Sequence, residues 1–526
     1  MATIVMFENE YTWGKALADG KQDEFNKKFD DSVEHVKNHF DEKRPCIING
    51  KKIFSDKIFE VRSPANTKLI IATFPKLDEA ETKEAIGSAK DAFDEWSNTP
   101  YEKRAEVFNQ TADHFSERKF ELAAWMSFEN GKTRIEAIND VDEAIDFMRF
   151  YSYQLEKNEG FCKHTPHPNP HEKTMSVLKP YGVWGIIAPF NFPSAIAIGM
   201  TTGALLTGNT TVLKPASAAP LSSYFFAEII ANKISQGAIN FITGDGSVVG
   251  KTLIESKDVD GIAFTGSQAV GMTSFKRFTE QTPKPFIAEM GGKNPVIVTR
   301  NSDLDKAVEG VMRAAFGFGG QKCSACSRVY VQKDISQEFI KKLVEKSKLL
   351  KIGMPWDRDT FLGPVIDKEA VSKFENAVNI AKKDGKIIFG GSKIENPEYK
   401  DGYFVQPTIV ANLPKDHRLV TDELFLPFLC IDTYDDFNEA IALANKSEYG
   451  LTAGIFSADK SQIDEFFKKI HAGTVYANRQ SSATTAALVQ SQPFVGWKKS
   501  GITGKGAGGE YYLQQFLRTQ TQTLCD

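Results

Sequence analysis

The stretch FGFGGQKCSAC, residues 316–326, places Cys323 directly behind a run of glycines. Those glycines allow the backbone to approach a ligand closely or to adopt a positive φ. A cysteine thiolate is a strong nucleophile, and its pKa falls near positive charge or a helix N-terminus. The pattern therefore favours Cys323 as the nucleophile of covalent catalysis.

Three other interpretations of the same stretch stay open. Cys323 and Cys326 form a CxxC pair, but a redox pair of the thioredoxin type usually opens a helix early in a small domain. A zinc site would need a second pair at suitable spacing, and the sequence has none. An ordinary small residue in a turn is the third interpretation.

Two further stretches contain groups that could complete such a site. In AEMGGKNP (288–295), Glu289 precedes two glycines, and a partly desolvated glutamate can act as a general base near neutral pH. In FTGSQAVG (264–271), Gly266 and Ser267 open a helix whose free N–H groups suit a pyrophosphate. Taken alone, a surface glutamate and a tight strand–helix turn would explain these two patterns.

Alternating apolar segments predict the elements that position these groups. Strands are expected at 181–190, 210–215, 238–244 and 261–266, with helices at 194–208, 217–235, 247–256 and 268–279. This alternation indicates a parallel sheet with ligands beyond the carboxyl ends of its strands, where 189–194, 214–218, 243–246 and 265–271 fall. A second series starts near residue 285, with strands at 296–299, 329–331, 404–410 and 450–456 and helices at 303–317 and 335–350. Two α/β domains with a boundary near residue 290 are predicted.

The first 175 residues predict helices and then an arm. Helical patterns occupy 21–44, 86–96, 104–127 and 134–157. Residues 160–174 contain three prolines and three histidines, but only Glu172 accompanies the histidines as a further ligand. An extended arm or linker is favoured over a metal site, and no metal is expected.

Composition limits the class of protein. The 526 residues carry a formal net charge of −4, which gives no basic field for nucleic acid or an anionic membrane surface. Six cysteines in so long a chain do not resemble a secreted disulfide scaffold, and neither a signal peptide nor an 18-residue apolar run is visible. A cytoplasmic protein with no nucleic-acid or membrane partner is expected.

The motifs together resemble those of the aldehyde dehydrogenase superfamily. AEMGGKNP and FGFGGQKCSA match its two signatures in order and separation, and PFNFP (189–193), LKPA (213–216), FTGSQAVG and DELFLPF (422–428) agree along the chain. The resemblance covers roughly residues 50–520 and implies an α/β fold with two open-sheet domains and a small oligomerisation arm. The expected parts are a variant Rossmann cofactor domain (1–158 and 176–290), a catalytic domain (291–480), and an arm with a substrate-anchoring C-terminal segment (159–175 and 481–526).

The resemblance implies a role for each matching residue. Cys323 is expected to be the nucleophile, Glu289 the base that activates water, and Asn191 the side-chain donor to the oxyanion beside the N–H of Cys323. An aldehyde would be oxidised to a carboxylic acid through a thiohemiacetal and a thioester, with NAD as hydride acceptor.

Ten positions match cofactor contacts of this superfamily. Lys214 is expected at the adenosine ribose, Ser267 at the pyrophosphate, and Glu423 at the nicotinamide ribose. The other matching positions are Pro189, Phe190, Ser217, Gly246, Thr265, Gly266 and Phe425. Many relatives carry at position 217 a glutamate that rejects a 2′-phosphate, so NADP is not excluded as a cofactor.

The stretches FGFGGQKCSACSRVYV and ATTAALVQSQPFVGWKKSG are similar to the delta-1-pyrroline-5-carboxylate dehydrogenase family, which oxidises L-glutamate γ-semialdehyde in proline catabolism. The resemblance implies Ser324 beside the nucleophile, a carboxylate-anchoring turn at Ala486 and Ala487, Phe494 closing the pocket, and Glu143 near the substrate ammonium. Succinic or 2-oxoglutaric semialdehyde as substrate, a thiol hydrolase and a non-catalytic protein of the same fold are the alternatives.

Some positions depart from the family pattern, and the ends of the chain suggest assembly. The anchoring turn usually has glycine where this chain has Ala486, which would cost about 1 kcal/mol if φ is positive there. Leu426 stands where glycine is common. The arm and residues 505–526 resemble segments that pair across a dimer, so a homo-oligomer built of dimers is expected.

Overall fold

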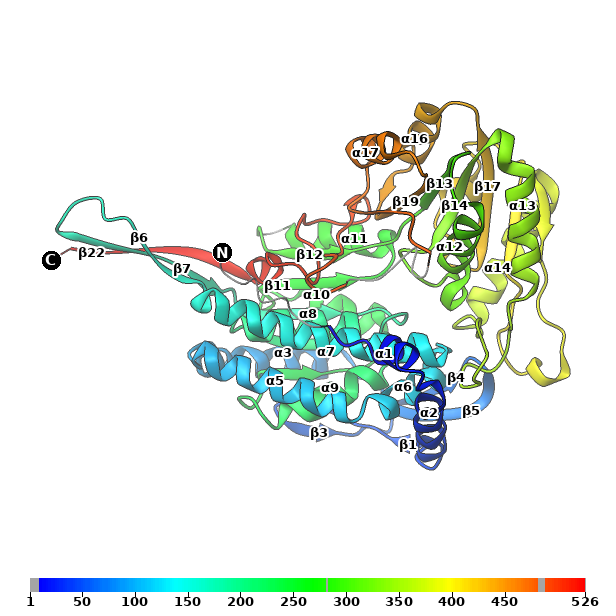
Figure 1. The fold of residues 1–526 in the computed structure, drawn as a ribbon. Coiled ribbons are helices and arrows are strands. Elements are labelled where there is room, and N and C mark those ends of the chain that lie inside the picture. Colours follow the sequence, from blue (N-terminus) through cyan, green and yellow to red (C-terminus); the bar gives the residue numbers. More distant parts are fainter. Residues whose placement is uncertain (1–8, 281, 481–487, 526) are drawn as a thin grey trace.

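Two seven-stranded sheets form the centre of the protein (Figure 1). The computed structural model describes residues 9–280, 282–480 and 488–525. The first sheet has the order β12-β11-β8-β9-β10-β2-β3, and the second has the order β15-β16-β17-β14-β13-β19-β20. The expected α/β fold with two open sheets is confirmed.

The first sheet positions the segments expected to bind the cofactor. Its strands are β12 (Phe286–Glu289), β11 (Gly261–Thr265), β8 (Val183–Ile187), β9 (Thr210–Lys214), β10 (Ile239–Phe241), β2 (Cys46–Ile48) and β3 (Lys51–Ile53). The first five are parallel, and the chain order reverses at β8, which has β9 on one side and β11 on the other. Ligands of such sheets bind where the strand order reverses. Residues 188–194 and 266–267 follow β8 and β11 at that point.

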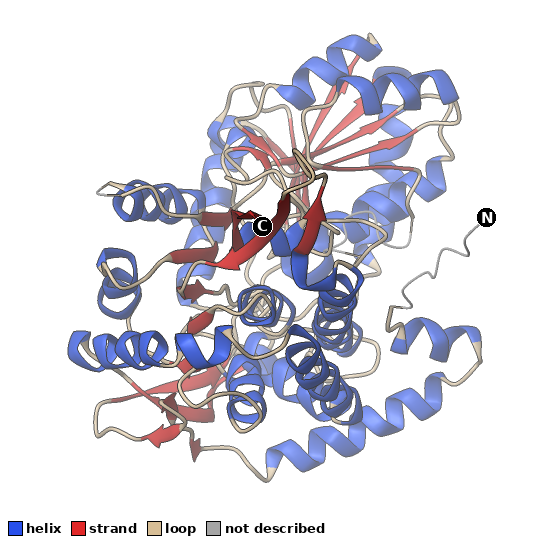
Figure 2. Ribbon diagram, turned by 90° about the vertical axis from the view of Figure 1, so that its left-hand side faces the viewer, coloured by secondary structure: helices blue, strands red, loops and turns tan. Residues whose placement is uncertain are grey.

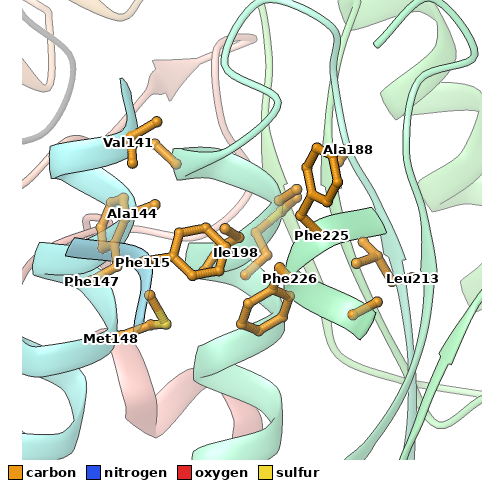
Figure 3. Packing of buried hydrophobic residues seen from close by; sticks show 14 of the residues in the cluster. Phe115, Val141, Ala144, Phe147, Met148, Ala188, Ile198, Leu213, Phe225 and Phe226 are labelled. Atoms are coloured by element: carbon orange, nitrogen blue, oxygen red, sulfur yellow. The ribbon is translucent and has the colours of Figure 1, made fainter. Parts of the chain in front are cut away.

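Helices cover both faces of this sheet. They are α3 (Glu79–Asp91), α5 (Tyr101–Glu117), α6 (Lys119–Asn130), α7 (Arg134–Lys157), α8 (Ala195–Leu206), α9 (Leu221–Ala231), α10 (Lys251–Glu255) and α11 (Gln268–Thr279). Figure 3 shows the core where α5, α7, α8 and α9 meet, with the side chains of Phe115, Phe147, Ile198 and Phe226 packed together. All four are buried, so the helices that carry active-site residues stand on a rigid base.

The second sheet begins immediately after the first ends. Its strands are β13 (Asn294–Val298), β14 (Cys326–Gln332), β15 (Lys386–Phe389), β16 (Thr408–Ala411), β17 (Phe428–Tyr434), β19 (Thr452–Phe456) and β20 (Thr474–Ala477). Its helices are α12 (Leu304–Phe316), α13 (Lys333–Lys348), α14 (Lys368–Asp384), α16 (Phe437–Asn445) and α17 (Lys460–Lys469), which flank the fan of strands in Figure 2.

Neighbouring parallel strands explain why the two signature motifs meet. β13 and β14 are paired in parallel, with Asn294 opposite Cys326. AEMGGKNP leads into β13, and the loop with Cys323 leads into β14, so both segments lie at the end of the sheet where these two strands begin. Glu289, the last residue of β12, belongs to the connection between the two sheets and lies at the same end.

A three-stranded antiparallel arm projects from the body (Figure 1). It consists of β6 (Cys162–Thr165), β7 (Glu172–Pro180) and β22 (Leu517–Cys525), with Leu517 opposite Pro180. Residues 160–174 thus form most of a hairpin, where the sequence suggested an extended arm or linker, and β7 continues past residue 175. The described residues contain no cluster of three His, Cys, Asp or Glu side chains that could hold a metal.

Several predicted boundaries were wrong. The helix expected at 104–127 is two helices that meet at Arg118, and the one expected at 217–235 starts only after Pro220. The segment 247–256 begins with a π-helical turn, Gly246–Gly250. The other elements are α1 (Thr12–Ala18), α2 (Gln22–Lys37), α4 (Phe93–Ser97), α15 (Arg418–Thr421), β1 (Glu42–Lys43), β4 (Ile58–Ser63), β5 (Asn66–Pro75), β18 (Tyr449–Gly450) and β21 (Trp497–Lys498). None of the described helices has both the length and the apolar content needed to cross a bilayer.

Candidate active site

Cys323 lies in a tight turn between the helical turn Gly317–Gly320 and β14. The backbone is left-handed at Phe318, Gly319 and Gly320, with φ of 49°, 61° and 65°. A Cβ atom at Gly320 would overlap the carbonyl oxygen of Leu426. Glycine is thus required for the nucleophile loop to pack against the DELFLPF segment.

Asn294 supports the turn that contains Cys323 by hydrogen bonds to its backbone. Its amide donates to the carbonyl oxygens of Cys323 (2.7 Å) and Ala325 (2.9 Å), and its Oδ1 accepts the N–H of Thr452 (3.0 Å). A Cβ at Gly292 would lie 2.5 Å from the same Cys323 oxygen. The first signature motif is therefore the platform of the nucleophile loop. Sequence reasoning missed Asn294, although its place in that motif was a usable signal.

Asn191 is buried, and its amide donates to the carbonyl oxygen of Gln321 at 3.1 Å. Gln321 is two residues before Cys323, so this hydrogen bond places the Asn191 amide against the loop that carries the nucleophile. The role of Asn191 as the oxyanion donor stays a prediction.

Glu289 has one carboxylate oxygen, Oε2, that is buried and has no hydrogen-bond partner among the described residues. The backbone N–H of Gly496 bonds to the carboxylate, but burial dominates and raises the pKa of Glu289 well above its usual value. A buried carboxylate with a spare acceptor is suited to take a proton from water.

One small cavity of about 50 Å³ joins Cys323 and Glu289, and Asn191 is not among its lining residues. Cys323, Ser324, Glu289, Glu143 and Phe494 all line it. Four expected catalytic and substrate-binding residues from the second half of the chain therefore line the same cavity as Glu143 of α7. Ser324 is buried, and its carbonyl oxygen accepts the Thr452 hydroxyl at 3.2 Å. The expected anchors Ala486 and Ala487 lie outside the described residues.

An aromatic wall completes the cavity and was not predicted. Phe147 and Tyr151 line it together with Glu143, from successive turns of one face of α7. Tyr151 stacks on Tyr512 with ring centroids 5.1 Å apart, and its hydroxyl accepts the N–H of Gly508 at 2.9 Å. The four-residue spacing on α7 was a signal for the first two. Tyr512 lies in a different part of the chain, and its position depends on tertiary packing.

Burial raises the pKa of the Cys323 thiol, and the charges of Glu423 and Glu289 act in the same direction. A positive charge brought near the sulfur would favour the reactive thiolate.

Several of the expected cofactor residues lie at the ends of β9 and β11. Lys214 is buried, which lowers its pKa to about 8, and its ammonium donates to the carbonyl oxygen of Pro215 at 3.0 Å. Ser267 caps α11, with its hydroxyl 3.5 Å from the N–H of Val270. Thr265 lies beside Glu289 in the sheet and lines the cavity.

Two further expected contacts, Gly246 and Ser217, lie at an open part of the surface. A Cβ at Gly246 would meet no atom within 4 Å, and Ser217 is exposed, with its hydroxyl donating to the carbonyl oxygen of Gly244 at 3.3 Å. Val248 and Val270 are 37% and 55% exposed at the starts of two neighbouring helical segments. These exposed valines, which sequence reasoning did not select, offer an apolar surface for a planar base.

The DELFLPF segment forms the other end of the expected cofactor site. Glu423 accepts the N–H of Gly292 at 2.9 Å, and burial raises its pKa. Phe425 packs edge-on against Phe190 at 5.9 Å, next to Pro189. Leu426 is buried and has no positive φ, so its departure from the family pattern causes no backbone strain.

These groups fit a dinucleotide. An ammonium group and a carboxylate suit ribose hydroxyls, and the open N-terminus of α11 beyond Gly266 suits a diphosphate. A carboxylate at Glu423 also lies on the Cys323 side of the site, since it contacts Gly292 of the motif that supports the nucleophile loop.

The aldehyde dehydrogenase family matches this chain over residues 52–522. Among curated relatives, the 1-pyrroline-5-carboxylate dehydrogenase of Geobacillus sp. (strain WCH70) is 36% identical over 506 residues, covering 95% of this chain and 96% of that protein. The same enzyme of Bacillus cytotoxicus (strain DSM 22905 / CIP 110041 / 391-98 / NVH 391-98) is 38% identical, covering 94% and 95%.

Solved structures agree with this relationship. The 1-pyrroline-5-carboxylate dehydrogenase from Thermus with bound NAD superposes with a TM-score of 0.92 at 32% identity, covering both chains completely. Proline utilization A (PutA) from Bdellovibrio bacteriovorus superposes with a TM-score of 0.92 at 34% identity, where 99% of this chain covers 53% of that one.

Proposed function

The chain belongs to the aldehyde dehydrogenase family, and on that basis we propose that it oxidises L-glutamate γ-semialdehyde, formed from pyrroline-5-carboxylate, to L-glutamate with NAD in proline catabolism. The observation that carries this proposal is the single cavity lined by Cys323, Glu289 and Glu143. The curated relatives, which are 1-pyrroline-5-carboxylate dehydrogenases over almost their whole length, support the choice of substrate.

Cys323 begins the reaction. Its thiolate attacks the aldehyde carbon, and the resulting alkoxide accepts hydrogen bonds from the Asn191 amide and the N–H of Cys323. Two such donors stabilise the charge that develops in the transition state. For this, the Asn191 amide exchanges the Gln321 carbonyl for the substrate oxygen.

Glu289 completes the reaction. Bound NAD supplies the acceptor for the hydride that leaves the former aldehyde carbon. The product on Cys323 is a thioester. Glu289 takes a proton from water, the hydroxide attacks the thioester carbon, and the C–S bond breaks to release the acid and the thiolate.

Residues at one end of the site would bind the cofactor, and residues at the other end would bind the substrate. Lys214, Ser267 and Glu423 would hold the cofactor, and the NAD-bound Thermus relative supports this cofactor. Glu143 is proposed to face the substrate ammonium and Phe494 to cover the substrate chain. A buried cationic group needs such a carboxylate partner.

A panel of aldehydes tests this function. NADH formation is measured with pyrroline-5-carboxylate, succinic semialdehyde and 2-oxoglutaric semialdehyde. We expect kcat/KM for pyrroline-5-carboxylate to exceed the others by about 10-fold or more, because Glu143 would pair with an ammonium that only this substrate has. Equal values would reject the proposed substrate, and no NADH with any aldehyde would reject the dehydrogenase.

Position 217 gives a test of cofactor choice. Replacing Ser217 by glutamate is expected to lower kcat/KM for NADP by about 10-fold or more while leaving that for NAD within about twofold, because a carboxylate there would repel a 2′-phosphate. Ser217→Ala is the matched control, since it removes the hydroxyl without adding charge. An equal loss with both cofactors would show that residue 217 does not face the adenosine ribose.

We further propose a homo-oligomer built through the arm, in a reducing cytoplasm. In the described structure β6 and β22 each pair only with β7, so both outer edges of the arm offer backbone groups to another chain. The six cysteines form no disulfide, which fits a reducing compartment. Light scattering of the intact protein measures the number of subunits.

A further inference from the structure

Lys132 is completely buried in the loop between α6 and α7. Its ammonium lies 2.7 Å from Oδ2 of Asp140 on α7, and neither side chain has any solvent exposure. The described residues contain other ion pairs, but this pair lies beside the active-site loops.

The pair contacts the segment that follows Asn191. The second oxygen of Asp140 accepts the N–H of Ala195, the first residue of α8, at 2.7 Å. The Lys132 ammonium lies 3.5 Å from the ring centroid of Phe192, close enough for a cation–π interaction. The residue after Asn191 and the helix that follows are therefore tied to the same two charges.

Asn130 holds Phe190, the residue before Asn191. Its side-chain oxygen accepts the N–H of Lys132 at 3.2 Å, and its amide nitrogen donates to the carbonyl oxygen of Phe190 at 3.1 Å. We call Asn130, Lys132 and Asp140 the Lys132 cluster.

The cluster also reaches the nucleophile loop. The Lys132 ammonium lies 5.2 Å from the ring centroid of Phe318. Lys322, the residue before Cys323, pairs with Glu136 of α7 at 3.3 Å. One end of α7 thus contacts the loops that carry Asn191 and Cys323.

A buried ion pair is a poor way to gain stability, because removing two charges from water offsets most of their attraction. Apolar residues of similar volume would hold the loop with Lys132 against α7 equally well. The pair is useful where groups must be held in one orientation, as at a site that needs precise donor geometry.

We propose that the Lys132 cluster positions the Asn191 amide for the oxyanion, so that Lys132 and Asp140 are positioning residues of the reaction. The proposal rests on the proposed function, in which Asn191 donates to the alkoxide. Neither residue is among those that line the cavity with Cys323.

A double-mutant cycle between Lys132→Met and Asn191→Ala tests the proposal, with the single-turnover rate of NADH formation as the readout. Asn191→Ala is expected to lower the rate by about 10²–10³-fold. Lys132→Met is expected to lower it by about 10–100-fold. The double variant should be no slower than Asn191→Ala, because the cluster acts through that amide. Losses that multiply, or an unchanged rate in Lys132→Met, would overturn the proposal.

Lys119→Met is the matched control. Lys119 pairs with Asp142 of α7 at 3.3 Å and is also mostly buried, but its other partners, Glu10 and Thr12, belong to the N-terminal segment. Its effect on the rate should stay within about twofold and be the same in the Asn191→Ala background.

A second variant and a stability measurement separate the outcomes. Asp140→Asn keeps an acceptor for the Ala195 N–H and loses the charge, so it should reproduce the Lys132→Met kinetics. Thermal unfolding by circular dichroism reports the folded state of each variant, and failure of both to fold would assign the pair to stability and overturn the proposal. A wild-type protein that forms no NADH would instead reject the proposed function.

Discussion

Replacement of Cys323 by alanine is expected to lower aldehyde-dependent NADH formation by at least about 10⁴-fold, because the covalent intermediate cannot form. The sulfur lines the cavity shared with Glu289, and the Asn294 amide holds its backbone at 2.7 Å. Steady-state kinetics with pyrroline-5-carboxylate and NAD measures the loss. Turnover within 10-fold of the wild type would remove Cys323 from the mechanism.

Cys326→Ala is the matched control for this experiment. Cys326 is buried, and its thiol lies 3.4 Å from the carbonyl oxygen of Arg328, away from the cavity lining. Its replacement should leave kcat within a few-fold of the wild type and lower only stability. An equal loss of activity in both variants would favour a dithiol mechanism.

Replacement of Glu289 by glutamine is expected to separate the two halves of the reaction. Acylation continues, so each active site should form one NADH in a burst, whereas steady-state turnover falls by about 10²–10⁴-fold without the base. The reason is that Oε2 of Glu289 is a buried acceptor without a partner among the described residues. Stopped-flow absorbance of NADH measures both phases. A lost burst with unchanged deacylation would contradict this role.

The pH dependence of the two phases should follow the same assignment. Burial raises the pKa of Glu289, so its carboxylate is protonated below that pKa and becomes a base only as pH rises through it. The wild-type deacylation rate should therefore increase with pH. The Glu289→Gln variant lacks this titration, so its slow deacylation should not show the same rise.

The sequence predicted the chemistry better than the scaffold. The resemblance of whole motifs to a known family selected Cys323, Glu289 and Asn191, and their individual roles stay predictions, because each short pattern taken alone fits an ordinary turn. The helix boundary at Arg118 and the late start after Pro220 were missed because the apolar pattern continues across both points. Local periodicity cannot show where a helix ends when its neighbours keep the same face buried.

Residues that act through tertiary contacts were also out of reach. Tyr512 meets Tyr151 only after the C-terminal segment folds back onto α7. Lys132 is a single lysine in a short loop, and its burial depends on Phe192 and Phe318 from two distant segments. Asn294 is different, because it lies inside a recognised motif next to a strand that pairs with β14. Register between neighbouring strands could have placed it beneath Cys323.

The most direct test of the central claim is the location of the acyl group. Glu289→Gln protein is mixed with pyrroline-5-carboxylate and NAD and quenched with acid, which keeps the substrate amine protonated so that it cannot displace the thioester. Peptide mass spectrometry should then find one glutamyl group per subunit on the peptide that contains Cys323, and none in the Cys323→Ala background. A glutamyl group on another residue, or none despite a full burst of NADH, would contradict the account.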